Sequence, residues 1–336
     1  MQNNDVFIIA EIAQAHDGSL GIAHSYIDAL KGIGVDAIKF QIHIAEAESS
    51  IYEAFRIKFS LEDATRYDYW KRMEFTPEQW AGLKKHCEES GMEFMASPFS
   101  NAAVNLLEKL EVKKYKIGSG EVSNLLMLEK IAKIGKPVIL SSGMSSYEEL
   151  DAAVDVLKSN NCSFSILQCT TAYPSKPEEW GLNVMQELKR RYNVPVGFSD
   201  HSGDIYACLA ASALNAEILE FHVVFNKEMF GPDAPASITM DQVKILVKGI
   251  RQIEKSLNNP VKKDDTLAFT DLKNMFEKSL AVNRDLKAGT VITPEMLEAK
   301  KPKGYGIPAS DFLTVIGKTL KNELKTWSFL KYDDIV

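Results

Sequence analysis

Short apolar runs alternate with amphipathic stretches over the first two-thirds of the chain. Each run is rich in β-branched residues and ends in polar ones, as buried strands do, and helix-like segments lie between the runs. Eight runs are predicted to be strands: 7–13, 36–41, 93–98, 114–119, 137–143, 164–170, 195–201 and 218–224. The helix-like stretches between them include 76–90, 101–111, 146–160 and 203–215.

This repeat predicts the fold class. Eight β–α units of this size are typical of an α/β protein of the (β/α)8 TIM-barrel type. An open, doubly wound sheet is the alternative, but no GxGxxG motif follows the first strand, which counts against it. One helix start is explicit, because Thr76 can cap a helix and Pro77 suits its first position.

The sequence pattern changes after the eighth predicted strand. An amphipathic helix is predicted over 240–257 and completes a TIM-barrel catalytic domain at 1–257. Residues 258–278 are polar and are predicted to be an irregular linker. Residues 279–336 contain short apolar runs broken by turn residues, which predicts a small β-rich domain that serves as a cap or an assembly element.

The segment 42–75, between the second strand and the next helix, is too long for an ordinary βα loop. Its basic and aromatic side chains include Arg56, Lys58, Arg66, Tyr67, Tyr69 and Trp70. A long loop at a barrel mouth is either a lid or binding loop, or a purely structural flap. The residues leave both interpretations open.

Composition narrows the functional class. The formal net charge of −7 disfavours nucleic acid, which requires clustered Lys and Arg. The cysteines Cys87, Cys162, Cys169 and Cys208 form no CxxC pair, and we expect buried free thiols in a reducing compartment. The N-terminal segment lacks the basic region of a secretory signal, and no apolar run reaches membrane-spanning length. We therefore expect a cytoplasmic protein.

Polar residues occur at the C-terminal ends of all eight predicted strands, where barrel enzymes build their active sites. In strand order they are Glu11; Lys39 and Gln41; Ser97; Lys116, Ser119 and Glu121; Ser141 and Ser142; Thr170, Thr171 and Tyr173; Ser199 and His201; Glu220 and His222. One or two such residues would mean little, but a set at eight successive strand ends predicts one site.

Lys39 and Lys116 lie inside apolar strands, where a buried lysine needs an anionic partner. That partner is either a glutamate of the chain (Glu11, Glu121 or Glu220) or the phosphate and carboxylate of a ligand. A Schiff-base lysine is a third interpretation. Two lysines among many hydroxyls favour anion binding over a single nucleophile.

His201 and His222 end consecutive predicted strands, so we expect their imidazoles to be neighbours at the barrel mouth. A pair of imidazoles suits a divalent transition metal such as Mn, Fe, Co or Zn. His16 and His43 also lie near strand ends and are further candidates. The matched positions of His201 and His222 on adjacent strands favour a metal site over two separate core histidines.

Several motifs together resemble those of one family. They are IAEIAQAHDGSL (9–20), IKFQ (38–41), ASPFS (96–100), YKIGSGE (115–121), ILSSGM (139–144), CTTAYP (169–174), GFSDHS (197–202), ILEFH (218–222) and GPDAPAS (231–237). With them, nearly the whole chain resembles the N-acetylneuraminate synthase family, the sialic acid synthases and their legionaminic and pseudaminic acid relatives. The resemblance implies a TIM barrel followed by an antifreeze-like domain of the SAF, or β-clip, type.

The resemblance also implies a reaction and assigns residues to it. Phosphoenolpyruvate would condense with an N-acylated amino-sugar aldehyde, either N-acetylmannosamine or a 2,4-diacetamido-trideoxyhexose, and phosphate would leave. The positions for phosphoenolpyruvate match Lys39, Ser97, Lys116, Ser119, Ser141 and Ser199, and those for the sugar match Glu11, Gln41, Tyr173 and Asp233. His201 and His222 match manganese ligands, and Glu121 matches a carboxylate that handles water. We expect Glu121, Glu11, Lys39 and Lys116 to be the catalytic residues.

Two substrate-binding positions depart from the family pattern. Thr171 stands where many members have Asn, and Lys301 replaces an Arg that reaches the sugar's N-acyl group from the partner subunit. This arrangement implies a domain-swapped homodimer in which each cap covers the other subunit's barrel. Because Lys lacks the planar fork of Arg, the acceptor sugar is the part expected to differ.

Two alternatives remain open. One is a phosphoenolpyruvate-dependent synthase acting on a different sugar or a sugar phosphate, as in the octulosonate phosphate synthases, with Arg56, Lys58 and Arg66 as a second phosphate site. The other is a non-catalytic carbohydrate-binding relative that kept the fold, against which the set of lysines, glutamates and histidines argues.

Overall fold

The structure, a computed structural model of the chain, describes residues 5–57, 59 and 61–336. Lys58, one of the basic residues noted in the long segment, lies outside the described residues. The chain divides into two compact units, Met1–Asn259 and Pro260–Val336, each of which is described by itself.

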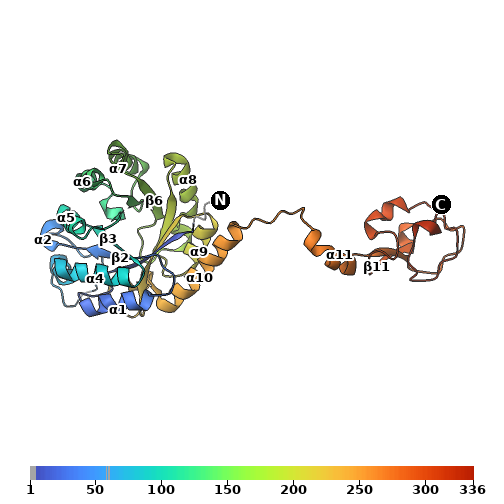
Figure 1. Cartoon of the computed structure of the whole chain (residues 1–336), viewed down its shortest axis with the longest axis horizontal. Coiled ribbons are helices and arrows are strands. Elements are labelled where there is room, and N and C mark those ends of the chain that lie inside the picture. The colour runs from blue at the N-terminus through green and yellow to red at the C-terminus, as the bar shows by residue number, and fades with distance from the viewer. Residues whose placement is uncertain (1–4, 58, 60) are drawn as a thin grey trace. The chain divides into compact units, whose positions relative to one another are not determined.

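Eight parallel strands form the wall of the first unit (Figure 1). They are β1 (Phe7–Ala13), β2 (Ala37–Ile42), β3 (Glu93–Pro98), β4 (Tyr115–Ile117), β5 (Val138–Ser141), β6 (Phe164–Cys169), β7 (Val196–Asp200) and β8 (Ile218–Val224). Their hydrogen-bonded order is β3-β2-β1-β8-β7-β6-β5-β4, and its two end strands follow each other in the chain. The sheet therefore curves into a nearly closed barrel, which confirms the predicted fold class.

Helices alternate with the strands and cover the outside of the barrel (Figure 1). They are α1 (Leu20–Leu30), α4 (Pro77–Glu89), α5 (Asn101–Lys109), α6 (Leu125–Ile134), α7 (Tyr147–Ser159), α8 (Leu182–Tyr192), α9 (Tyr206–Ala213) and α10 (Met240–Leu257). The predicted start of α4 is confirmed. The Thr76 hydroxyl accepts from the Gln79 amide, the Gln79 side chain returns to Thr76, and Pro77 is the first helical residue.

The two-residue period of each strand sorts side chains between the outside and the inside of the barrel. Outward-facing residues such as Ile8 and Ala10 join the large core shared with the helices. Inward-facing residues form a small apolar cluster of Ile9, Ala37, Met95, Ile139 and Leu167. Two positions further along four of these strands stand Glu11, Lys39, Ser97 and Ser141. An apolar floor thus lies beneath a polar layer at the C-terminal ends of the strands.

Strand β7 reaches this layer only because residue 197 is glycine. A Cβ atom there would lie 2.1 Å from the carbonyl oxygen of Ile218 and 2.7 Å from Cδ2 of Leu167. Glycine permits this close approach to the neighbouring strand and the floor. Ser199 and His201, further along the same strand and its end, depend on this placement.

The long segment 42–75 contains two short helices, α2 (Ala45–Glu48) and α3 (Arg66–Met73). Ala45, Tyr69, Trp70 and Met73 are buried together in a small apolar cluster of their own, with Phe55, Phe59 and Tyr67 against it. The segment is therefore a packed element and not an open loop.

The second unit has a separate core, made of Leu280, Val282, Leu286, Ile292, Ile307, Val315, Leu320 and Leu330. Its antiparallel strands are β10 (Ser279–Val282) and β11 (Leu297–Lys300), and isolated bridges and 3-10 turns complete it. Helix α11 (Thr270–Phe276) forms inside the segment predicted to be irregular. Its 7 residues are too few for helical periodicity to show in the sequence.

All four cysteines are buried and free, as predicted. Over the described part of the chain, no helix combines the length and the apolar character needed to cross a membrane.

Candidate active site

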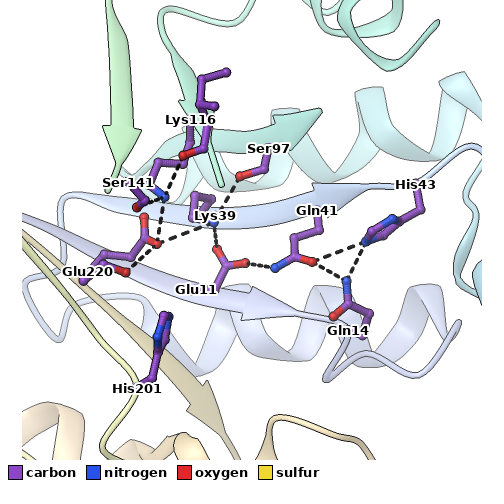
Figure 2. Close-up of polar contacts among 12 residues, drawn as sticks. Glu11, Gln14, Lys39, Gln41, His43, Ser97, Lys116, Ser141, His201 and Glu220 are labelled. Carbon is purple, nitrogen blue, oxygen red and sulfur yellow. Dashed lines mark hydrogen bonds and ion pairs between the residues drawn. The ribbon is translucent and has the colours of Figure 1, made fainter. Parts of the chain in front are cut away.

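Four charged side chains meet inside the barrel, above the apolar floor (Figure 2). Lys39 of β2 forms ion pairs with Glu11 of β1 and with Glu220 of β8, where Nζ lies 3.7 Å from Oε1. Lys116 of β4 contacts the same Oε1 of Glu220 at 3.3 Å. Glu220 therefore bridges two lysines that come from different strands. Of the three glutamates considered as partners, Glu11 and Glu220 fill that role.

Three hydroxyl groups complete this cluster. Lys39 donates to Oγ of Ser97 at 3.3 Å, and Lys116 donates to Oγ of Ser141 at 2.7 Å (Figure 2). Ser199 donates to Oε1 of Glu220 at 3.2 Å. Each hydroxyl comes from a different strand end, as the sequence predicted.

Burial and charge oppose each other in setting the pKa values of the cluster. Burial lowers the pKa of Lys39, but Glu11 and Glu220 outweigh it, so this pKa is raised. For Lys116 burial prevails over the attraction of Glu220, and the pKa is lowered. Burial raises the pKa of Glu220, but the two lysines more than offset it and lower the pKa. Glu220 is thus held ionised between its partners.

Two adjoining cavities open at the C-terminal ends of the strands. The inner one, of about 50 Å³, is lined by the ionic cluster and its hydroxyls together with His201 and His222. The outer one, of about 360 Å³, is lined by side chains of the 42–75 segment and of the βα loops. Gln41, Ser119, Tyr173 and His222 border both cavities. We call them the inner and outer chambers.

His201 and His222 lie against each other, with ring centroids 5.3 Å apart. Nδ1 of His201 is 2.7 Å from the carbonyl oxygen of Thr170, so Nδ1 carries the proton and Nε2 is left as the free ligand atom. The hydroxyl of Tyr173 lies 3.1 Å from that Nε2. Burial, followed by the neighbouring His222, lowers the pKa of His201 to about 3. The imidazole is therefore neutral at pH 7, which is the form that binds metals.

The imidazoles of His201 and His222 fit a metal ion that keeps open coordination positions. Among the described residues, no group of three or more His, Cys, Asp and Glu side chains is arranged to hold a metal. Two imidazole ligands leave most coordination positions to water or substrate, as catalytic sites require. Nearby, Oε2 of Glu220 is buried and has no hydrogen-bond partner among the residues described. A buried acceptor of this kind can accept a hydrogen bond from a bound group or from water.

Glu121 and Ser119 lie just beyond the end of β4, on a short 3-10 helix (Ser119–Glu121), where a longer strand was predicted. Burial raises the pKa of Glu121, although Asn124 donates to its Oε2 at 2.8 Å and opposes the shift. Ser119 lies 3.3 Å from Thr171, Oγ to Oγ1. Glu121 lines the outer chamber and not the inner one, so it stays apart from the ionic cluster.

Asp233 lines the outer chamber through its contact with the 42–75 segment. Its Oδ1 accepts from Arg56 at 2.8 Å, and the Arg56 guanidinium lies 4.4 Å from the ring centroid of Tyr173. Lys301 is the one predicted site residue that belongs to the second unit. There its Nζ lies 4.7 Å from the ring centroid of Phe276.

Several residues of the outer chamber were missed from the sequence, among them Gln14, Glu48 and Phe99. Gln14 and Phe99 stand directly after predicted strand ends, within IAEIAQAH and ASPFS, and that position was the available signal. Glu48 lies on the short helix α2, which no sequence pattern revealed.

Replacing Glu220 with Gln is expected to lower the free energy of unfolding at pH 7 by about 3–5 kcal/mol, because two buried lysines lose their shared carboxylate. In the wild type, the contribution of Glu220 is complete above pH 4.5 and is lost as the pH falls toward about 2. The difference between the two proteins should therefore shrink over this range in urea unfolding curves.

The matched control is Glu217→Gln, whose partly exposed carboxylate pairs with Lys189 at 2.6 Å. That change is expected to cost less than about 1 kcal/mol. A Glu220→Gln difference that stays constant from neutral to acidic pH would contradict the assigned ionisation.

The family matches and the relatives of this chain agree with each other. Residues 26–262 match the NeuB family, and residues 277–336 match the SAF domain. The N-acetylneuraminate-9-phosphate synthase of Homo sapiens is 35% identical over 93% of this chain and 88% of its own length. The N,N'-diacetyllegionaminic acid synthase of Campylobacter jejuni is 34% identical over 95% of this chain and 96% of its own.

A solved structure agrees with these matches. The N-acetylneuraminic acid synthetase of Leptospira borgpetersenii, in complex with citrate, superimposes with a TM-score of 0.71 at 31% identity, covering 80% of this chain and 90% of its own. The resemblance seen in the sequence is thereby confirmed. The chain belongs to the NeuB family, carries a C-terminal SAF domain, and is a synthase-type transferase.

Proposed function

We propose that this protein is a nonulosonic acid synthase that condenses phosphoenolpyruvate with an N-acylated amino-sugar aldehyde and releases phosphate. The observation that carries the proposal is the pair of adjoining chambers, one small and lined by lysines and hydroxyls, the other larger and lined by amides, carboxylates and aromatic rings. A small anion suits the first and a sugar suits the second. Relatives named as sialic and legionaminic acid synthases support this division.

The inner chamber suits phosphoenolpyruvate because its donors can be shared with an anion. The ammonium groups of Lys39 and Lys116 each carry three protons, and Ser97 and Ser141 stand beside them. The two lysines with Glu11 and Glu220 carry no net charge when all four are ionised. A divalent cation held by His201 and His222 would supply the positive charge that phosphate and carboxylate require.

The outer chamber suits an acceptor without a phosphate group. Arg56 is paired with Asp233, and Arg66 is paired with Glu53 at 2.9 Å. Both guanidinium groups are therefore already neutralised by carboxylates. This observation favours an N-acylated sugar over the sugar phosphate alternative, although the human relative is named for a phosphorylated product.

We assign the chemical roles as follows. Lys39 and Lys116 bind phosphoenolpyruvate and balance the charge of its phosphate and carboxylate. His201 and His222 would hold a divalent cation, proposed to be Mn²⁺, which would supply Lewis acidity toward the aldehyde. The enol carbon attacks the aldehyde carbon, and the aldehyde oxygen takes up a proton to become a hydroxyl. Water adds to the carbon that bears phosphate, and phosphate leaves by C–O cleavage. Glu121, with its raised pKa, takes a proton from that water.

We also propose a domain-swapped homodimer in which the SAF domain of one subunit caps the barrel of the other, with Lys301 near the sugar. Large apolar side chains exposed in the βα loops and in the first turn of α6 support a cover at this end of the barrel. They include Tyr52 at 89%, Leu126 at 76% and Met144 at 66% exposed. The buried free thiols fit the cytoplasm as the proposed compartment.

The wild-type protein is expected to release phosphate from phosphoenolpyruvate only when an N-acylated amino sugar is added. The measurement is phosphate release with N-acetylmannosamine, its 6-phosphate, a 2,4-diacetamido-trideoxyhexose and arabinose 5-phosphate, with mass spectrometry of each product. Because both outer arginines are paired, the unphosphorylated sugars should react faster. Turnover confined to the sugar phosphates would reject the proposed acceptor, and no turnover with any of them would reject the synthase.

Chelation is expected to abolish this activity, and added Mn²⁺ is expected to restore it. The His201→Ala, His222→Ala double variant should bind no Mn²⁺ in titration calorimetry, because it lacks both imidazoles. The control is His24→Ala, His86→Ala, which removes a histidine pair with Nδ1 atoms 2.8 Å apart on α1 and α4. Chelator-resistant turnover by the first double variant would exclude the metal role.

Deleting residues 277–336 is expected to leave a folded barrel with its own core but to reduce turnover at least tenfold, because the mouth loses its cover. Mixing this truncated chain with full-length His201→Ala, His222→Ala protein should restore part of the activity, since the intact cap of one chain covers the intact barrel of the other. Full activity of the truncated chain, or no restoration on mixing, would contradict the swapped cap.

A further inference from the structure

A hydrogen-bonded chain of four side chains leads from the ionic cluster to the outer edge of the site (Figure 2). Gln41 donates from Nε2 to Oε1 of Glu11 at 2.8 Å. Gln14 Nε2 lies 2.5 Å from Oε1 of Gln41 and 2.8 Å from Nε2 of His43. Nδ1 of His43 lies 2.5 Å from Oε1 of Glu48. All four residues line the outer chamber.

The direction of each hydrogen bond follows from the charged end of this chain. Glu11 is paired with Lys39 and can only accept, so the amide nitrogen of Gln41 must face it and the carbonyl oxygen of Gln41 points outward. Gln14 therefore turns its amide nitrogen toward Gln41. The second proton of that nitrogen faces Nε2 of His43, which must present a lone pair.

This arrangement assigns the protonation of His43. With a lone pair on Nε2, the single proton of the neutral ring is on Nδ1 and is donated to Glu48. The other tautomer would set N–H against N–H between His43 and Gln14. Turning the Gln14 amide over would instead set two carbonyl oxygens, those of Gln14 and Gln41, against each other at 2.5 Å. The assigned pattern gives each of the three shorter contacts one donor and one acceptor, and it leaves without a proton only the longer contact, 3.3 Å, between Nε2 of His43 and Oε1 of Gln41.

The ring of His43 is also held in place by packing. It is stacked between Trp70, with ring centroids 3.8 Å apart, and Phe99, with ring centroids 4.4 Å apart, both at 16°. Glu48 is held in turn by the backbone amide of Ile44, which donates to its Oε2 at 3.2 Å. Neither the ring nor its carboxylate partner can turn without displacing these neighbours.

We propose that His43 and Glu48 are positioning residues that hold the amides of Gln14 and Gln41 in one orientation at the wall of the acceptor site. Within the part of the chain that the structure describes, this orientation leaves one proton of the Gln41 amide and the carbonyl oxygen of Gln14 for a ligand. A donor beside an acceptor recognises a hydroxyl or an amide group of the acceptor sugar. The inference rests on the proposed function for its ligand, but not for the tautomer.

The tautomer is tested directly by long-range ¹H–¹⁵N correlation spectra of histidine-labelled full-length protein at pH 7.5. The His43 signals are assigned by their loss in His43→Phe, which keeps a ring between Trp70 and Phe99. We expect a neutral ring with the proton on Nδ1. A proton on Nε2, alone or together with one on Nδ1, would overturn the proposal whether or not the protein is a synthase.

The isosteric change Glu48→Gln tests the effect on binding. The amide of the new side chain can donate to Nδ1 of His43, which moves the ring proton to Nε2 and turns Gln14. The KM for N-acetylmannosamine is expected to rise about three- to tenfold, as for the loss of one hydrogen bond. The KM for phosphoenolpyruvate is expected to stay within about twofold, because the inner chamber is untouched.

The matched control is Glu46→Gln on the same helix, whose exposed carboxylate contacts Lys71 at 3.4 Å. It should change neither KM nor the His43 signals. Equal rises in both KM values, or an unchanged sugar KM in a folded Glu48→Gln protein, would reject the positioning role. If the wild type does not turn over N-acetylmannosamine, that acceptor is excluded, and the tautomer spectra still decide the inference.

Discussion

The carboxylate of Glu220, shared between Lys39 and Lys116, is the interaction on which the rest of the site depends. Two ammonium groups inside a barrel would repel each other and lose their protons if no anion lay between them. Glu220 supplies that anion and Glu11 supplies a second. The four groups come from β1, β2, β4 and β8, so their pairing also joins strands from different parts of the barrel.

The barrel and the long segment after β2 contribute different parts of the site. The strands place charged and hydroxyl side chains above an apolar floor, where only the small inner chamber remains open. The 42–75 segment, packed around Trp70, forms much of the wall of the larger chamber. The ionic cluster therefore belongs to the strands, and much of the lining of the larger chamber belongs to the segment.

Gln41 connects these two parts. It stands one strand period beyond Lys39 on β2, binds Glu11 on its inner side and faces Gln14 on its outer side. Because Lys39 holds Glu11 as an acceptor, the direction of the hydrogen bond from Gln41 is fixed. The directions at Gln14 and then at His43 follow from it. A hydrogen-bond chain with one consistent direction holds its members more firmly than separate bonds would, because reversing any one of them disturbs its neighbours.

The sequence by itself determined the eight strands and the polar residues at their ends, because side chains alternate along a strand and the C-terminal ends of parallel strands meet at one face. It therefore identified the lysines, serines and histidines of the inner chamber. Only the tertiary structure decided that Glu220 and not Glu121 bridges the lysines, since Glu121 lies past the end of β4 and faces the outer chamber. It also decided the Gln14–His43–Glu48 chain, because those contacts depend on how helices α2 and α3 pack, and short helices leave no periodic signal in the sequence.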